Sequence, residues 1–156
     1  HFIRQKDPGF ERVNTFVIPL PTTKIKKKRD LLKSDFLKIN TVENIAACSE
    51  YPGWGFTKNG YVPEGYQDAI LIHELGGDED LLPVLGLQIK KGRNFSKSHS
   101  TDKGKYLINE ALVREMNWDD PIGKMINRNS SHEIIGVFND FNFATLHEKI
   151  APLAGY

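Results

Sequence analysis

Two short apolar runs, residues 106–108 and 133–138, flank a segment with the signals of one short helix, and this pattern constrains the fold more than any other feature. Asn109 is a favourable N-cap, and Glu110 suits the positive end of the helix dipole. The apolar residues that follow fall on one helical face: Leu112, Val113 and Met116. Residues 119–124 (DDPIGK) form a turn that ends the helix, and the second run, EIIGVF, is rich in β-branched residues. The pattern predicts strand, helix, turn and strand.

Length and composition indicate one domain. The chain has 156 residues, 39% hydrophobic and 26% charged, and a net charge of +1 that gives no steering toward nucleic acid. The single cysteine, Cys48, excludes an internal disulfide. No run approaches the roughly 18 apolar residues of a membrane helix, and no signal peptide pattern opens the sequence. Taken alone, these features favour a cytoplasmic protein.

The N-terminal third predicts a strand–helix–strand unit. Residues 13–20 alternate as a strand does and end near Pro19, and Thr22 or Thr23 can cap the helix that follows. The apolar residues of this helix lie on one stripe and form a first predicted core: Ile25, Leu32, Phe36 and Ile39. Residues 41–48 (TVENIAAC) predict a second strand, with a parallel crossover as the default connection.

A basic run opens the same helix: Lys24, Lys26, Lys27, Lys28 and Arg29. Such a run is either a contact for phosphate, nucleic acid or lipid headgroups, or a solvated helix face. We favour the solvated face, because no aromatic or glycine platform accompanies the charges.

Residues 50–60 (EYPGWGFTKNG) predict a loop, since they contain three glycines and a proline. Trp54 and Phe56 in this loop are candidate contacts for a ligand or partner. Packing onto the core is the alternative, and it is the one we favour.

The middle of the chain predicts two strands, at residues 61–66 and 69–75, and a turn with a short helix over residues 76–85. An acidic cluster begins that helix: Asp78, Glu79 and Asp80. Its spacing does not match the calcium-binding loop, and acidic residues in a first helical turn need no metal. A second predicted core comes from the later strands: Ile70, Ile72, Leu107, Ile135 and Val137.

No catalytic, cofactor or metal motif is present. Gly123-Lys124 lacks the upstream glycine and the following Ser or Thr of a phosphate loop. No histidine has a second histidine three or four residues away, so a zinc site would need distant ligands. We therefore predict a protein that is not an enzyme, with no catalytic, cofactor-binding or metal residues. A Ser-His-Asp triad stays open, because triads are defined by geometry.

Four motifs in order resemble a known family: the Asn109-Glu110 helix start, W-D-D-P-I-G-K, I-I-G-V-x-x-D-F and L-H-E-K-I-x-P. They resemble the extracytoplasmic core domain of MacB-type ABC transporter permeases of the FtsX-like superfamily, in the form of Bacteroidetes-type bacteria. Residues 85–95 resemble a further segment of these permeases. There we expect Gly92 to supply a turn conformation and Arg93 to pair with a carboxylate or carbonyl.

The resemblance implies a location and partners. It places the domain between two transmembrane helices, at the periplasmic face of the bacterial inner membrane. It implies a cytoplasmic ATPase acting through the full-length permease, a homodimer in the membrane and a periplasmic partner protein. The implied function couples ATP-driven helix motion to substrate export or partner engagement. The alternative is a soluble periplasmic ligand-binding or sensory domain.

Strands interspersed with short helices predict an α+β fold. The resemblance adds a division into two lobes within one MacB-like domain, residues 1–156. A porter-like βαβ lobe would take residues 13–50 and 139–156, and an inserted β-rich lobe with short helices would take residues 51–138.

Overall fold

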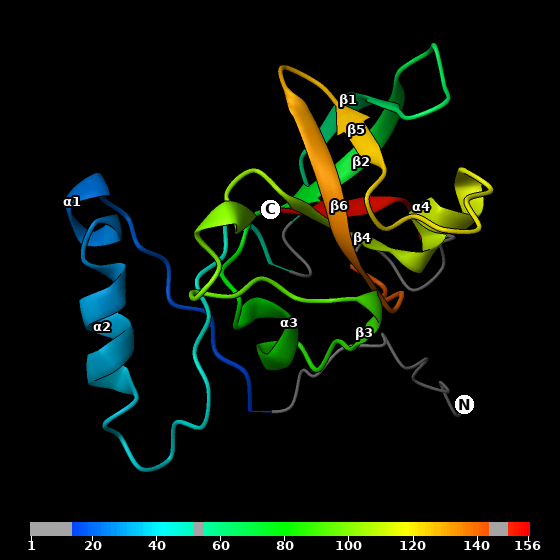
Figure 1. Cartoon of the computed structure of the whole chain (residues 1–156). Coiled ribbons are helices and arrows are strands. Elements are labelled where there is room, and N and C mark those ends of the chain that lie inside the picture. The colour runs from blue at the N-terminus through cyan, green and yellow to red at the C-terminus, as the bar shows by residue number, and fades with distance from the viewer. Residues whose placement is uncertain (1–13, 52–54, 144–149) are drawn as a thin grey trace, which may run out of the picture.

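A seven-stranded sheet with a few short helices confirms the α+β class (Figure 1). The computed structural model describes residues 14–51, 55–143 and 150–156. The helices are α1 Thr23–Lys26, α2 Arg29–Phe36, α3 Leu81–Val84 and α4 Glu110–Glu115, with a 3-10 helix η1 at Ser100–Asp102. The strands are β1 Lys58–Pro63, β2 Ile70–Leu75, β3 Ile89–Gly92, β4 Tyr106–Asn109, β5 Met125–Asn127, β6 Ser131–Phe138 and β7 Leu153–Gly155.

The sheet closes on itself. Its strand order is β3-β6-β4-β7-β2-β1-β5, and β5 also pairs with β6. β4 runs parallel to β6, and β2 runs parallel to β7, while the other neighbours are antiparallel. Only β3 lies outside the closed circuit of the described strands, paired with β6 alone. The closure leaves few free strand edges within the described sheet.

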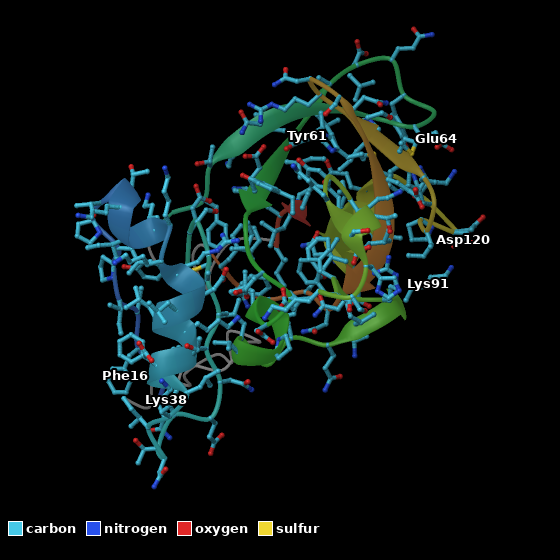
Figure 2. The ribbon with its side chains drawn as sticks, turned by 60° about the vertical axis from the view of Figure 1, so that its left-hand side comes forward. Phe16, Lys38, Tyr61, Glu64, Lys91 and Asp120 are labelled. Atoms are coloured by element: carbon cyan, nitrogen blue, oxygen red, sulfur yellow. The ribbon has the colours of Figure 1, made fainter. Side chains whose placement is uncertain are left out.

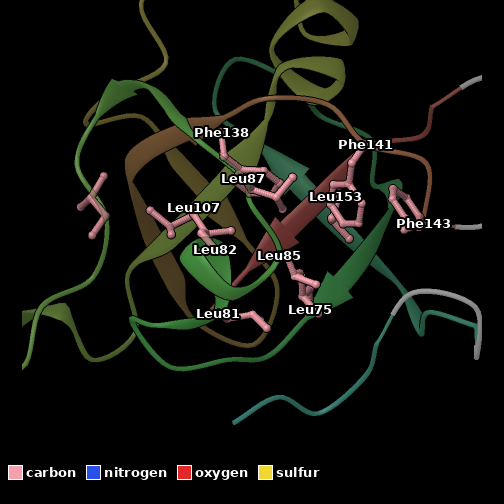
Figure 3. Close-up of a cluster of buried hydrophobic side chains, with 11 residues drawn as sticks. Leu75, Leu81, Leu82, Leu85, Leu87, Leu107, Phe138, Phe141, Phe143 and Leu153 are labelled. Carbon is pink, nitrogen blue, oxygen red and sulfur yellow. The ribbon is translucent and has the colours of Figure 1, made fainter. Parts of the chain in front are cut away.

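Alternating side chains of the sheet supply two hydrophobic clusters. On β4, Leu107 points into one cluster, while Tyr106 and Ile108 point into the other, as the period of two requires. The first cluster gathers the leucines of α3, Phe138 at the end of β6, and Phe141 and Phe143 just beyond it (Figure 3). The second is centred on Tyr61, Ile72 and Ile134 and is covered by α4.

The segment that most constrained the fold forms as predicted. The Asn109 side chain caps α4, where it accepts a hydrogen bond of 3.1 Å from the Leu112 amide. Asn117 follows the helix with φ 47°, the left-handed conformation that ends many helices. The predicted strands around this helix are β4 and β6. Four residues of the second predicted core are buried, and Ile70 is partly buried.

Two predicted strands are wrong. The described part of residues 13–20 has no strand, and Phe16 is 88% exposed there. Residues 41–48 form only an isolated bridge between Cys48 and Gly77. A strand exists only when a neighbouring strand completes its hydrogen bonds, and no described strand lies beside either segment.

The first predicted core is also wrong. The predicted helix forms as α1 and α2, and Thr22 caps α1 through a hydrogen bond of 3.3 Å from the Ile25 amide. None of the residues in these two helices is buried. Leu32 and Phe36 are only partly buried, and Ile25 and Ile39 are exposed, so the stripe forms no core.

Three strands were missed: β3, β5 and β7. β5 is three residues long, and β7 has the sequence LAG, which carries almost no strand signal. The predicted helical turn near residue 147 lies mostly outside the described residues. The division into two lobes stays a prediction, although β7, from the predicted porter-like lobe, pairs with β2 and β4 of the other.

Candidate functional site

Phe56, one of the two predicted contact residues, packs on the core while part of it stays at the surface. Its ring centroid lies 4.8 Å from that of Phe143, which also contacts the rings of His73 and Phe141. Trp54, the other candidate, lies outside the described residues. A role for this pair in binding stays a prediction.

A hollow of about 400 Å³ opens beside Phe56. Its lining consists of loop residues: Ser49, Glu50, Tyr51, Gly55, Phe56 and Thr57. The Glu50 carboxylate closes this loop, because it accepts hydrogen bonds of 3.1 and 3.0 Å from the Thr57 amide. The hollow is thus lined by one aromatic ring and by a carboxylate that is already hydrogen-bonded within the loop.

The described residues include a buried network of hydrogen-bonded polar side chains centred on Glu74. Glu74 on β2 accepts hydrogen bonds from the Tyr61 hydroxyl and, at 3.0 Å, from Arg128. The Tyr61 hydroxyl lies 3.4 Å from the Tyr106 hydroxyl. Arg128 also donates to Asn59 at 2.6 Å. The Glu74 carboxylate therefore joins β2 to β1 and to the β5–β6 turn, and the Tyr61 hydroxyl extends the network to β4.

The two tyrosine hydroxyl groups of the network, those of Tyr61 and Tyr106, keep their protons. Burial, together with the hydrogen bond to Glu74, raises the pKa of Tyr61 far above its ordinary value. Burial likewise raises the pKa of Tyr106. Both phenols stay protonated at physiological pH, so neither acts as a base. Because Glu74 is paired with Arg128, the cluster suits the fastening of strands better than proton transfer.

Sequence reasoning missed this network, although one signal was available. Ile70, Ile72 and Glu74 share a face of β2, so burial of Ile72 implies burial of Glu74. A buried carboxylate needs a cation or several donors. The identity of that cation, Arg128, follows only from the tertiary structure.

The acidic cluster before α3 contacts a lysine from a distant helix. Lys33 Nζ lies 2.7 Å from Asp78 Oδ2 and 2.5 Å from Asp80 Oδ2. Across the part of the chain that the structure describes, His, Cys, Asp and Glu side chains nowhere gather in threes suited to a metal ion. The expected pairing of Arg93 is confirmed, since it binds the carboxylate of Asp102. Gly92 has φ 72°, the turn conformation expected of it.

Comparisons with protein-family models and with curated proteins give no match. Solved structures do match. A permease domain from Porphyromonas gingivalis has a TM-score of 0.53 at 18% identity and covers 76% of this chain and 54% of that chain. The periplasmic region of MacB from Actinobacillus actinomycetemcomitans has a TM-score of 0.57 at 15% identity and covers 80% of this chain and 53% of that chain.

The chain has the fold of a MacB-like periplasmic domain.

This chain spans about half the length of each of the two solved domains that it matches. The extracellular domain of the ABC-type transporter YknZ from Gram-positive bacteria also matches, with a TM-score of 0.47 at 16% identity over 79% of this chain and 60% of that chain. Every helix within the described residues falls short of the length and apolar character needed to cross a membrane.

Proposed function

We propose that this chain is the extracytoplasmic domain of an ABC transporter permease, at the periplasmic face of the inner membrane. The observation that carries the proposal is the match of its fold to the periplasmic region of MacB. In this role the domain hydrolyses no ATP itself. A cytoplasmic ATPase moves the membrane helices, and the domain converts that motion into substrate export or engagement of a periplasmic partner.

The closed sheet supports such a role, because a domain that transmits motion must resist deformation. The circuit of paired strands and the Glu74 network oppose sliding of one strand past another. Two full-length copies in one membrane would dimerise more readily than isolated domains, because their membrane helices raise the effective concentration. A monomeric isolated domain is therefore compatible with a homodimeric permease.

Labelling of Cys48 tests the location. Cys48 is the only cysteine of this chain and is exposed. Partial desolvation and the charge of Asp78 raise the pKa of its thiol, so labelling needs a mildly alkaline buffer. We expect a membrane-impermeant maleimide to label the full-length protein in intact spheroplasts.

The matched control is Cys48→Ser in the same full-length protein, which removes the signal due to this position. Labelling of Cys48 that appears only after the spheroplasts are lysed would place the domain in the cytoplasm and reject the proposal.

Ligand binding is a second candidate, favoured by the hollow beside Phe56. Under this function a small polar molecule would raise the melting temperature of the domain, and Trp54→Ala would abolish the shift. Absence of any shift across a broad panel of amino acids, sugars and nucleotides would count against it.

A further inference from the structure

Residues 14–47 form what we call the N-terminal arm: an extended segment, α1, α2 and the return to the sheet. Figures 1 and 2 show the two helices beside the sheet rather than against one of its faces, with Phe16 and Lys38 on the arm and Tyr61 in the sheet. α1 and α2 bury no residue fully. Only Leu32 and Phe36 of α2 add partly buried apolar surface, so hydrophobic burial holds these helices more weakly than it holds the sheet.

A short acidic segment contacts the middle of the arm. Lys33 of α2 donates to Asp78 Oδ2 at 2.7 Å and to Asp80 Oδ2 at 2.5 Å. The Lys33 side chain is only 12% exposed. Asp78 and Asp80 lie between β2 and α3, so they belong to the sheet rather than to the arm.

The same segment contacts the end of the arm. Asp78 Oδ2 also accepts a hydrogen bond of 3.0 Å from the Ala47 amide. In return, the Asp78 amide donates to the Ala47 carbonyl at 3.1 Å. Next to these bonds, Cys48 forms its isolated bridge with Gly77. One carboxylate, that of Asp78, thus binds both α2 and the residue at which the arm returns.

The pairing of Lys33 is stronger than an ordinary surface ion pair. Burial lowers the pKa of Lys33, but the hydrogen bonds and charges of Asp78 and Asp80 outweigh that effect and raise it. Just after α2, Lys38 pairs with Asp35 of the helix at 2.7 Å, but these side chains are 76% and 53% exposed. Exposed pairs of this kind contribute little to stability.

We propose that Lys33, Asp78 and Asp80 form a latch that fastens the N-terminal arm to the sheet, and that opening this latch releases the arm as a unit while the sheet stays folded. The domain then has two conformations that differ in the position of the arm. The inference rests on contacts within the domain and goes beyond the proposed transport role.

Hydrogen–deuterium exchange of the domain tests the latch with Lys33→Met, which keeps the length of the side chain and removes its charge. We expect exchange of the α2 amides and of the Ala47 amide to accelerate by roughly tenfold, as for loss of one partner of a partly buried ion pair. Exchange in β2, β4 and β6 should stay as in the wild type. In Lys33→Arg, which keeps the charge, the exchange rates of the α2 amides and of the Ala47 amide should stay much closer to those of the wild type.

Two control variants separate the latch from general loss of stability. Lys38→Met removes the exposed pair at the end of α2, and Asp102→Asn removes an ion pair that lies away from the arm. Equal acceleration of α2 in Lys33→Met and Lys38→Met would overturn the proposal. Acceleration of β2, β4 and β6 together with α2 would also overturn it, since the arm would then not open separately.

Discussion

At the scale of single residues, Asn109 joins three parts of the fold. It caps α4, donates to the Ala151 carbonyl at 2.9 Å and accepts from the Leu153 amide at 3.0 Å. The sequence predicted the cap, because capping is a local interaction between residues three apart. The bonds to the segment that leads into β7 span more than 40 residues, and no local pattern indicates them.

At Gly92, a substitution meets both backbone strain and a close backbone contact. Its φ is 72°, and an added Cβ would lie 2.3 Å from the Ile135 carbonyl oxygen. We predict that Gly92→Ala lowers the free energy of unfolding by about 2–4 kcal/mol, from backbone strain and overpacking together. Urea denaturation measures the change.

Gly104→Ala is the control for Gly92→Ala. Gly104 has a similar φ of 81°, but an added Cβ there would meet nothing within 4 Å. Backbone strain alone should cost about 1 kcal/mol. If both variants lost the same free energy of unfolding, contact of the added Cβ with β6 would not contribute to the effect at position 92.

At the scale of elements, one ion pair orders the loop between β3 and β4. Arg93 donates to both carboxylate oxygens of Asp102, at 2.8 and 2.5 Å, and the Ser96 amide donates to the same carboxylate at 3.0 Å. The sequence predicted a partner for Arg93 but did not indicate that the partner is Asp102. Asp102 lies in η1, and this short helix brings its carboxylate to Arg93 at the end of β3.

Asp102 makes stability depend on acid pH. The hydrogen bond from Arg93 lowers the pKa of Asp102 to about 2, from an ordinary 3.8. Because the folded state favours the ionised carboxylate, Asp102 stabilises the fold above about pH 4. This contribution is lost as the pH falls toward 2 and the carboxylate becomes protonated. We predict that Asp102→Asn removes about 1–2 kcal/mol at neutral pH, allowing for the partly exposed Arg93, and flattens the stability profile in this range.

Chemical denaturation at pH 7, 4 and 2 checks this prediction, with Asp120→Asn as the control. Asp120 pairs with Lys91 at 3.0 Å, but its side chain is 72% exposed, so we expect almost no change. A profile of Asp102→Asn parallel to that of the wild type would contradict the assigned role of Asp102.

At the scale of the whole molecule, the last strand completes the sheet. β7 lies between β2 and β4, and its residues Leu153 and Ala154 are fully buried, one in each hydrophobic cluster. We predict that deletion of residues 151–156 abolishes cooperative thermal unfolding, because it unpairs two central strands and opens both clusters.

The matched deletion removes residues 1–45, which include most of the N-terminal arm. Ala46, which packs against the first cluster, is kept. We expect circular dichroism to show a cooperative transition for this variant, since α1 and α2 bury no residue fully. Loss of cooperativity in both deletions would mean that the arm and the sheet fold as one unit.

The sequence by itself determined the local features of this protein. Cap residues, alternating apolar strands and glycine turns act over a few residues, so β2, β4, α4, β6 and Gly92 were predictable. The ordered motifs also indicated the MacB-like fold.

Only the tertiary structure decided which segments have partners. Residues 15–20 have strand-forming side chains but no neighbouring strand among the residues that the structure describes, whereas the weak LAG sequence becomes a central strand because β2 and β4 lie on either side. Lys33 contacts Asp78 across 45 residues, and Arg128 contacts Glu74 across 54. Hydrogen-bonded ladders and buried ion pairs form between distant segments, and their energies depend on geometry that a local pattern does not contain.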